Sequence, residues 1–209
     1  MAIPGFMARQ LARPSGWLGR HVMGRFLNRR TAAHNELVRR ELTVRPGESV
    51  LEVGFGGAAL LEKLVAEAAP GSVAGVEVSD EMLALATSRL RKPIAAGRLV
   101  LERASVEALP FSDAQFDKGC SVNTTYFWPD LSRGLSELRR VLRPGGRLVL
   151  GFVSAEDVVR AGLDRHGFAH HSTGELTAAL QAASFEVKQL RSGTDARGTF
   201  HVITAQRAR

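Results

Sequence analysis

The stretch VLEVGFGGA, residues 50–58, places a short apolar run directly before a glycine-rich turn. An apolar stripe follows at helical spacing and predicts a helix over 58–69; it consists of Leu60, Leu61, Leu64 and Val65. Glycine permits positive φ and close approach of a ligand to the backbone, and the start of a helix offers unpaired N–H groups. The stretch therefore predicts a strand, a ligand-binding turn and a helix, in that order.

The rest of the chain repeats this alternation of strands and helices. Apolar runs typical of strands lie at 49–53, 72–78, 98–102, 116–122 and 147–153, and helical patterns lie between them at 58–69, 80–92 and 131–142. Such alternation indicates a parallel sheet with helices on both faces. A helix at 173–183 and strands at 185–190 and 199–206 predict a terminal hairpin. We therefore expect an α/β fold with a Rossmann-like, mostly parallel seven-stranded sheet and a C-terminal antiparallel hairpin.

A carboxylate ends the second predicted strand. Glu77, in GVEVSDEM, lies where a carboxylate can accept two hydrogen bonds from a ribose diol. The alternative interpretations are a tight structural turn for the glycines and a helix-capping role for Glu77. Gly54, Gly56 and Ala59 also satisfy the relaxed dinucleotide pattern, so the turn alone leaves dinucleotides and S-adenosylmethionine both open as cofactors.

Four sequence blocks distinguish these two cofactors. LEVGFGGA, GVEVSDEML, EALPFSDAQFD and ELRRVLRPGGRLVL span residues 51–150. In this order and spacing they resemble the class I S-adenosylmethionine-dependent methyltransferases, in particular the ubiquinone/menaquinone-biosynthesis (type 11) group and its small-molecule relatives. The resemblance implies an enzyme that uses S-adenosylmethionine and releases S-adenosylhomocysteine.

The resemblance also implies which residues hold the cofactor. Glu52 and Gly54 would contact its methionine end, and Gly56 would allow its close approach. Glu77 would bind the ribose hydroxyls, and the apolar residues after it would pack on the adenine. The full implied set is Glu52, Gly54, Gly56, Glu77, Val78, Met82, Ser105, Val106, Glu107 and Asn123.

Two positions depart from the pattern of the family. An acid and a small residue often precede the LPF element and read the adenine, whereas this sequence has Ser105 and Val106 there. A serine hydroxyl can still accept a hydrogen bond, so the adenine contact is weakened in charge but not excluded. Ala58 stands where a third glycine is common, with Gly57 beside it.

Methyl transfer from a sulfonium is an in-line displacement, which needs alignment of the reacting atoms more than acid–base groups. A general base is required only if the nucleophile carries a proton, so no catalytic residue is assigned. Tyr126, with Phe127 and Trp128, predicts an aromatic wall beside the acceptor; the alternative is ordinary packing. His166 and His170 are further substrate-side candidates, with a surface loop as the alternative. No metal site is expected.

The excess positive charge lies in the first 45 residues, which hold nine arginines and two acids of a chain whose net charge is +7. We expect a basic N-terminal helical arm or lid over 1–45 and an S-adenosylmethionine-binding methyltransferase domain over 46–209. An apolar stripe in the arm comprises Val22, Met23, Phe26 and Leu27. The arm suits a small-molecule acceptor that is anionic or a lipid, or peripheral contact with a membrane; a solvated helix face is the alternative.

Composition limits the remaining possibilities. A single cysteine, Cys120, excludes an intrachain disulfide, and no apolar run reaches the ~18 residues of a membrane span. The N-terminus lacks the apolar core of a secretory signal, so a cytoplasmic location is expected. We predict methyl transfer to a small-molecule or lipid acceptor, with no stable nucleic-acid partner. The alternatives are a nucleic-acid or protein methyltransferase and a noncatalytic nucleotide-binding module.

Overall fold

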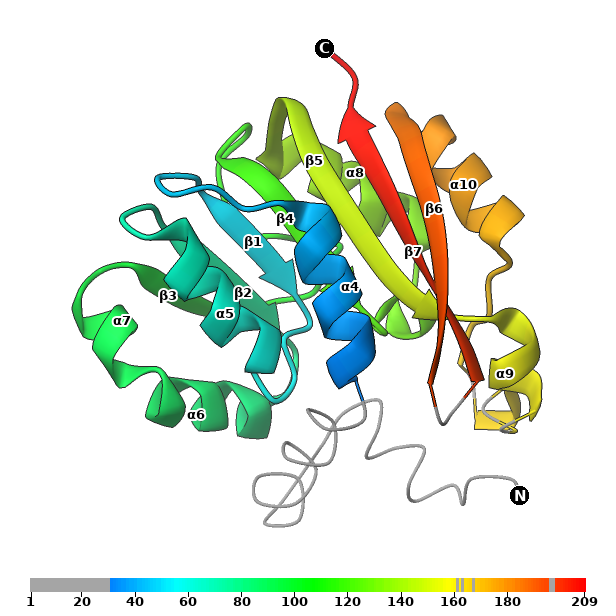
Figure 1. Ribbon diagram of the computed structural model, residues 1–209, viewed down its shortest axis with the longest axis horizontal. Coiled ribbons are helices and arrows are strands. Elements are labelled where there is room, and N and C mark those ends of the chain that lie inside the picture. Colours follow the sequence, from blue (N-terminus) through cyan, green and yellow to red (C-terminus); the bar gives the residue numbers. More distant parts are fainter. Residues whose placement is uncertain (1–30, 161, 163, 167, 196–197) are drawn as a thin grey trace.

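A computed structural model describes residues 31–160, 162, 164–166, 168–195 and 198–209, which form one seven-stranded sheet between layers of helices (Figure 1). The strands are β1 (Val50–Val53), β2 (Val73–Glu77), β3 (Leu99–Arg103), β4 (Phe116–Val122), β5 (Leu142–Val153), β6 (Phe185–Asp195) and β7 (Gly198–Arg207). The α-helices are α4 (Ala32–Leu42), α5 (Ala59–Ala68), α6 (Asp80–Arg89), α7 (Arg91–Ala95), α8 (Leu131–Val141), α9 (Ala155–Arg160) and α10 (Thr173–Ala182). Single 3₁₀ turns cover Thr125–Phe127 and Asp164–His166.

The strands lie in the order β3-β2-β1-β4-β5-β7-β6. Every pairing from β3 across to β5 is parallel. β7 is antiparallel to both of its neighbours, so it runs against the other six strands. The predicted fold, a mostly parallel sheet that ends in an antiparallel hairpin, is confirmed.

Helices cover both faces of the sheet, which is why β1 and β2 are buried along their whole length. On one face α4, α5 and α6 share an apolar cluster with the strands, formed among others by Val38, Leu42, Leu61, Leu64 and Ala86. On the other face α8 and α10 contribute Leu135, Leu138, Leu176 and Leu180. Each helix of the described chain is too short or too polar to cross a bilayer.

The direction of chain winding reverses between β1 and β4. β2 and β3 extend the sheet on one side of β1, and β4 and β5 extend it on the other. At such a switch point the connecting loops diverge beyond the carboxyl ends of the strands and leave a crevice. The candidate site is therefore expected at the edge where β1 ends, and the first turn of α4 lies at the same edge (Figure 1).

Two element boundaries differ from those predicted. β5 begins at Leu142, five residues earlier than predicted, because Leu142 already pairs with Phe116 of β4. A register shift separates this pair from the next one, Lys118 with Arg147. The helix predicted over 80–92 ends at Arg89 and is followed by the short helix α7. Pro93 explains that break, since proline lacks the N–H that would bond to the carbonyl of Arg89.

Part of the segment predicted as an arm packs on the sheet as α4. His34, Val38 and Leu42 are buried on its inner face. Arg147 also donates to the Glu41 carbonyl at 2.7 Å, so the end of α4 is tied to β5. Residues 32–42 thus contribute to the core. The apolar stripe at 22–27 lies outside the described residues, and the division of the chain at residue 45 stays a prediction.

Candidate cofactor site

A cavity lies beyond the carboxyl ends of β1 to β4, where the loops after these strands meet the start of α4. It contains nine of the ten positions predicted to hold the cofactor: Glu52, Gly54, Gly56, Glu77, Val78, Met82, Ser105, Val106 and Asn123. These nine positions extend from residue 52 to residue 123 along the chain, and the sheet brings them to one place. Whether each of these residues contacts the cofactor stays a prediction.

The glycine turn after β1 forms one wall of the cavity. Gly54 and Gly56 both have positive φ, 73° and 49°, so the turn needs residues without a side chain. The Gly54 N–H donates to the Val76 carbonyl at 2.7 Å, which fixes the turn to β2. A Cβ at Gly54 would overlap the methyl group of Thr124, because the loop after β4 presses against this turn.

Glu77 ties the glycine turn to the end of β2. One carboxylate oxygen accepts the Gly56 N–H at 3.0 Å, and the other accepts the N–H groups of Val78 at 2.8 Å and Ser79 at 3.1 Å. Burial raises the pKa of Glu77, and these three N–H bonds lower it. A carboxylate has about four acceptor positions, so Glu77 can accept a ligand hydroxyl as well.

Glu52 is a second buried carboxyl close to Glu77. It is 3% exposed, and its Oε2 atom forms no hydrogen bond within the described residues. Burial, and after it the nearby Glu77, raise the pKa of Glu52 to about 8. A buried carboxyl with a free oxygen is costly unless a donor or a cation meets it, so this wall of the cavity suits a ligand that carries one.

Apolar side chains line the side of the cavity next to β2 and β3. Val78 is 42% exposed, which is unusual for valine directly after a buried strand, whereas Met82 and Val106 are buried. Together they provide an apolar surface suited to a flat ring. Ser105 belongs to the same wall, and its hydroxyl accepts the Glu107 N–H at 3.3 Å.

Glu107 is the one predicted cofactor residue outside the cavity lining, and its contact with the cofactor stays a prediction. Its carboxylate accepts the Asp130 N–H at 2.6 Å, and its carbonyl accepts from Arg133 at 3.2 Å. These contacts direct the side chain toward the start of α8. Glu107 therefore braces the cavity wall from outside.

The loop after β4 supplies the opposite side of the cavity. Asn123 has a φ of 56°, and its amide oxygen accepts from the Tyr126 hydroxyl at 3.3 Å. Its buried Nδ2 group has no hydrogen-bond partner among the residues that the structure describes. Phe127 and Trp128 line the cavity, whereas the buried Tyr126 lies behind them and accepts the Val153 N–H. The predicted aromatic wall thus consists of two residues, with Tyr126 as a support.

The two predicted histidine candidates differ in how far the structure describes them. His170 is exposed and is absent from the lining. His166 belongs to the second 3₁₀ turn, and its side chain lies outside the described residues. Among the described residues no group of three or more His, Cys, Asp or Glu side chains could hold a metal ion.

Sequence reasoning missed the lining residues that come from the start of α4. Thr31 and Asn35, at the start of α4, contribute to the cavity although they precede all four sequence blocks. No motif marks them, and their position depends on how α4 packs against the sheet. The excess of arginines in the same segment was the one available signal.

Comparisons with known proteins agree with this geometry. Residues 51–150 match a family model described as a methyltransferase domain. The uncharacterized methyltransferase YdaC of Bacillus subtilis is 33% identical over 116 residues, which cover 56% of this chain and 62% of that protein. The ubiquinone/menaquinone biosynthesis C-methyltransferase UbiE of Geobacter sulfurreducens is 42% identical over 107 residues, covering 50% of this chain and 41% of that one. The chain thus spans about half the length of these curated relatives.

A solved structure supports the fold over the whole chain. The crystal structure of a SAM-dependent methyltransferase from Aquifex aeolicus superposes with a TM-score of 0.71 at 18% identity. The alignment covers 99% of this chain and 100% of the other. At this identity the likeness establishes the architecture.

Proposed function

Because residues 51–150 form a class I, S-adenosylmethionine-dependent methyltransferase domain of the type 11 group, we propose that this chain transfers the methyl group of S-adenosylmethionine to a small-molecule acceptor. The family and the cofactor predicted from the sequence are confirmed. The proposal concerns the activity of the whole protein and the class of its acceptor.

The observation that carries the proposal is the pair of carboxylates behind the glycine turn. Glu52 offers an unpartnered oxygen, and Glu77 offers further acceptor positions while holding the Gly56 N–H. The α-ammonium group of S-adenosylmethionine suits the first, and the ribose hydroxyls suit the second. Val78, Met82 and Val106 would then face the adenine.

The bound cofactor supplies a methyl group already activated by the positive charge on sulfur. The residues of this chain have three tasks: to bind the cofactor, to align the acceptor with it, and to exclude water. Alignment alone can contribute about 7–11 kcal/mol to lowering a barrier. Phe127 and Trp128 contribute apolar aromatic faces that exclude water and can contact an apolar or cationic acceptor.

Two features support a small or lipid acceptor. The Geobacter relative is named as a C-methyltransferase of ubiquinone/menaquinone biosynthesis, so a matching domain acts in the synthesis of a small molecule there. In this chain the cavity also includes Thr31 and Asn35, which directly follow the arginine-rich residues 1–30. Those arginines suit a carboxylate or phosphate on the acceptor, or the headgroups of a membrane that holds it.

Calorimetry on the purified chain tests the first part of the proposal. We expect saturable 1:1 binding of S-adenosylmethionine and S-adenosylhomocysteine and no binding of NAD. A screen of acceptors, with S-adenosylhomocysteine release as the readout, tests the second part. Binding of NAD alone would contradict the proposed cofactor, and methylation of nucleic acid or protein in preference to every small molecule would contradict the proposed acceptor class.

A further inference from the structure

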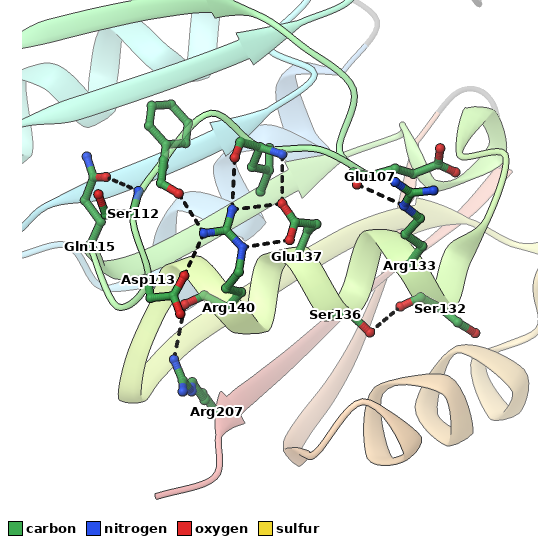
Figure 2. Close-up of polar contacts among 12 residues, drawn as sticks. Glu107, Ser112, Asp113, Gln115, Ser132, Arg133, Ser136, Glu137, Arg140 and Arg207 are labelled. Carbon is green, nitrogen blue, oxygen red and sulfur yellow. Dashed lines mark hydrogen bonds and ion pairs between the residues drawn. The ribbon is translucent and has the colours of Figure 1, made fainter.

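One face of α8 supports the wall of the cavity that lies next to β3. The side chains of Arg133, Glu137 and Arg140 recur at intervals of four and three residues, so they share a face of the helix. All three contact the segment 107–113, which follows directly on the lining residues Ala104, Ser105 and Val106 (Figure 2). None of the three lines the cavity itself.

All five N–H groups of Arg140 donate hydrogen bonds, either to the segment 107–113 or to Glu137 on the same helix. Its NH1 group donates to the Phe111 carbonyl at 2.7 Å and to Asp113 Oδ1 at 2.8 Å. Its NH2 group donates to the Leu109 carbonyl and to Glu137 Oε2, both at 2.9 Å, and its Nε donates to Glu137 Oε1 at 2.7 Å. A guanidinium has five donors in a rigid fork, so Arg140 spends three of them on this segment and two on Glu137, which itself accepts the Leu109 N–H.

Leu109 is held from both sides of its backbone. Its N–H donates to Glu137 Oε2 at 2.9 Å, and its carbonyl accepts from Arg140 at 2.9 Å. The hydrogen bond from Arg140 is the main reason that the pKa of Glu137 is lowered, so the pair is fully charged at neutral pH. The backbone of Leu109 thus bonds to the charged pair Glu137–Arg140, whereas in a sheet it would bond to a neighbouring strand.

The other end of the segment is fixed by contacts on the same helix face. Arg133 donates to the Glu107 carbonyl at 3.2 Å. A Cβ at Gly134 would overlap Trp128 and come within 3.1 Å of Val106, so two lining side chains rest directly on the helix at this glycine. The position of the wall therefore follows the position of α8.

We propose that Arg140 is a positioning residue for the adenine end of the cofactor, acting through the segment 107–113 on Ser105 and Val106. The inference rests on the proposed function, since it assumes that this cavity binds S-adenosylmethionine. It predicts that a change at Arg140 weakens cofactor binding although the side chain touches neither the cavity nor the cofactor.

Arg39 on α4 offers a matched control. Its side chain is 28% exposed against 31% for Arg140, and it too pairs with two carboxylates, Glu36 and Glu67. The contact with Glu36 lies within α4, the contact with Glu67 joins α4 to α5, and neither involves the segment 107–113. Arg39→Lys and Arg140→Lys therefore each replace a guanidinium that pairs with two carboxylates. Only the guanidinium of Arg140 also contacts the segment that supports the cavity wall.

The experiment compares the two lysine variants of the full chain by calorimetry with S-adenosylhomocysteine and by thermal unfolding. We expect both variants to unfold at a lower temperature. Arg140→Lys should raise the Kd by about 3- to 30-fold, the range typical of a coupled residue outside a site, and Arg39→Lys should leave it unchanged. The ratio of affinities for S-adenosylhomocysteine and S-inosylhomocysteine, which differ at the edge of the base, should fall only in Arg140→Lys.

A Kd in Arg140→Lys equal to that of the wild type, or equal Kd increases in both variants, would overturn the inference. If Arg140→Lys does not fold, Glu137→Gln replaces it, with Glu36→Gln as its control and the same expectations. Absence of S-adenosylhomocysteine binding by the wild-type chain would instead overturn the proposed function, and this inference with it.

Discussion

Glu77 has a structural role besides its proposed role in ligand binding, because its carboxylate accepts the backbone N–H groups of Gly56, Val78 and Ser79. We expect Glu77→Gln to keep the fold and to raise the Kd for S-adenosylmethionine at least about tenfold, since a lost hydrogen bond to a charged group costs about 1.5–3 kcal/mol. Glu77→Ala should also lower stability, because it leaves these N–H groups without their acceptor. Calorimetry and thermal unfolding on both variants measure the two effects, and unchanged affinity would refute the role in ribose binding.

The pKa of Glu52 links the stability of the cofactor-free protein to pH. The pKa rises from 4.5 to about 8 on folding, so the folded state binds a proton that the unfolded state has released between these values. The stabilisation is complete below the lower pKa and is lost as the pH rises through the higher one. We expect the free energy of unfolding to fall by on the order of 2–3 kcal/mol between about pH 5.5 and 8.

Glu52→Gln should remove this part of the pH dependence and should be more stable than the wild type at the higher pH. Urea unfolding at the two pH values measures it. Glu77 titrates in both proteins, so the difference between the two profiles isolates Glu52. Parallel profiles would show that the carboxyl at Glu52 is not held in its protonated form.

Between elements, the turns after β1 and β4 depend on each other through Gly54 and Thr124. The sequence suggests that a side chain at Gly54 would occupy the space of the methionine end, whereas the structure places it against the Thr124 methyl group. We expect Gly54→Ala to lose cofactor binding and stability, because of this overlap and the positive φ. Thr124→Ser removes the methyl group and keeps the hydroxyl that accepts from Trp128, so the double variant should recover part of the stability.

Thermal unfolding and S-adenosylhomocysteine titration of the two single variants and the double variant measure this coupling. Thr124→Ser alone is the control and should bind the cofactor normally. If the double variant is no more stable than Gly54→Ala, the positive φ at Gly54 accounts for the loss and the overlap with Thr124 does not.

The elements that could be predicted are those whose signal is local. The strands and helices of the four blocks follow from apolar periodicity, and the residues that meet in the cavity lie at strand ends in recognisable motifs. β5 begins at Leu142 rather than at Arg147 because pairing with β4 extends it, and pairing is not visible in one segment alone. The contacts of Glu107 could not be predicted for a similar reason, since its partners at 130 and 133 follow it by more than twenty residues.

At the scale of the whole molecule, α4 connects the core to the cavity. Its inner face buries Val38 and Leu42 against the sheet, and its first turn brings Thr31 and Asn35 to the cavity. The residues before Thr31 therefore join the body directly at the site. A segment in that position can influence binding of the acceptor without contributing to the fold. Two truncated chains, one of which keeps α4, can separate a role in acceptor binding from a role in folding.

We expect a chain that lacks residues 1–30 to fold and to bind S-adenosylhomocysteine as the full chain does, but to lose methyl transfer to its acceptor. All cofactor-side lining residues of the four blocks follow residue 49, so binding should persist, whereas loss of a cover would admit water and remove acceptor contacts. A chain that lacks residues 1–45 is the control. It also loses the buried Val38 and Leu42, each worth about 1.5–3 kcal/mol, and should be far less stable.

Thermal unfolding, S-adenosylhomocysteine affinity and turnover on an acceptor from the screen separate these outcomes. Full turnover after removal of residues 1–30 would show that this segment is not a lid, and its arginines would then form a solvated surface. Loss of cofactor binding by the same chain would show that residues 1–30 complete the cavity itself. Equal stability of the two shortened chains would contradict the place of α4 in the core, because burial of its inner face is the reason for the expected difference.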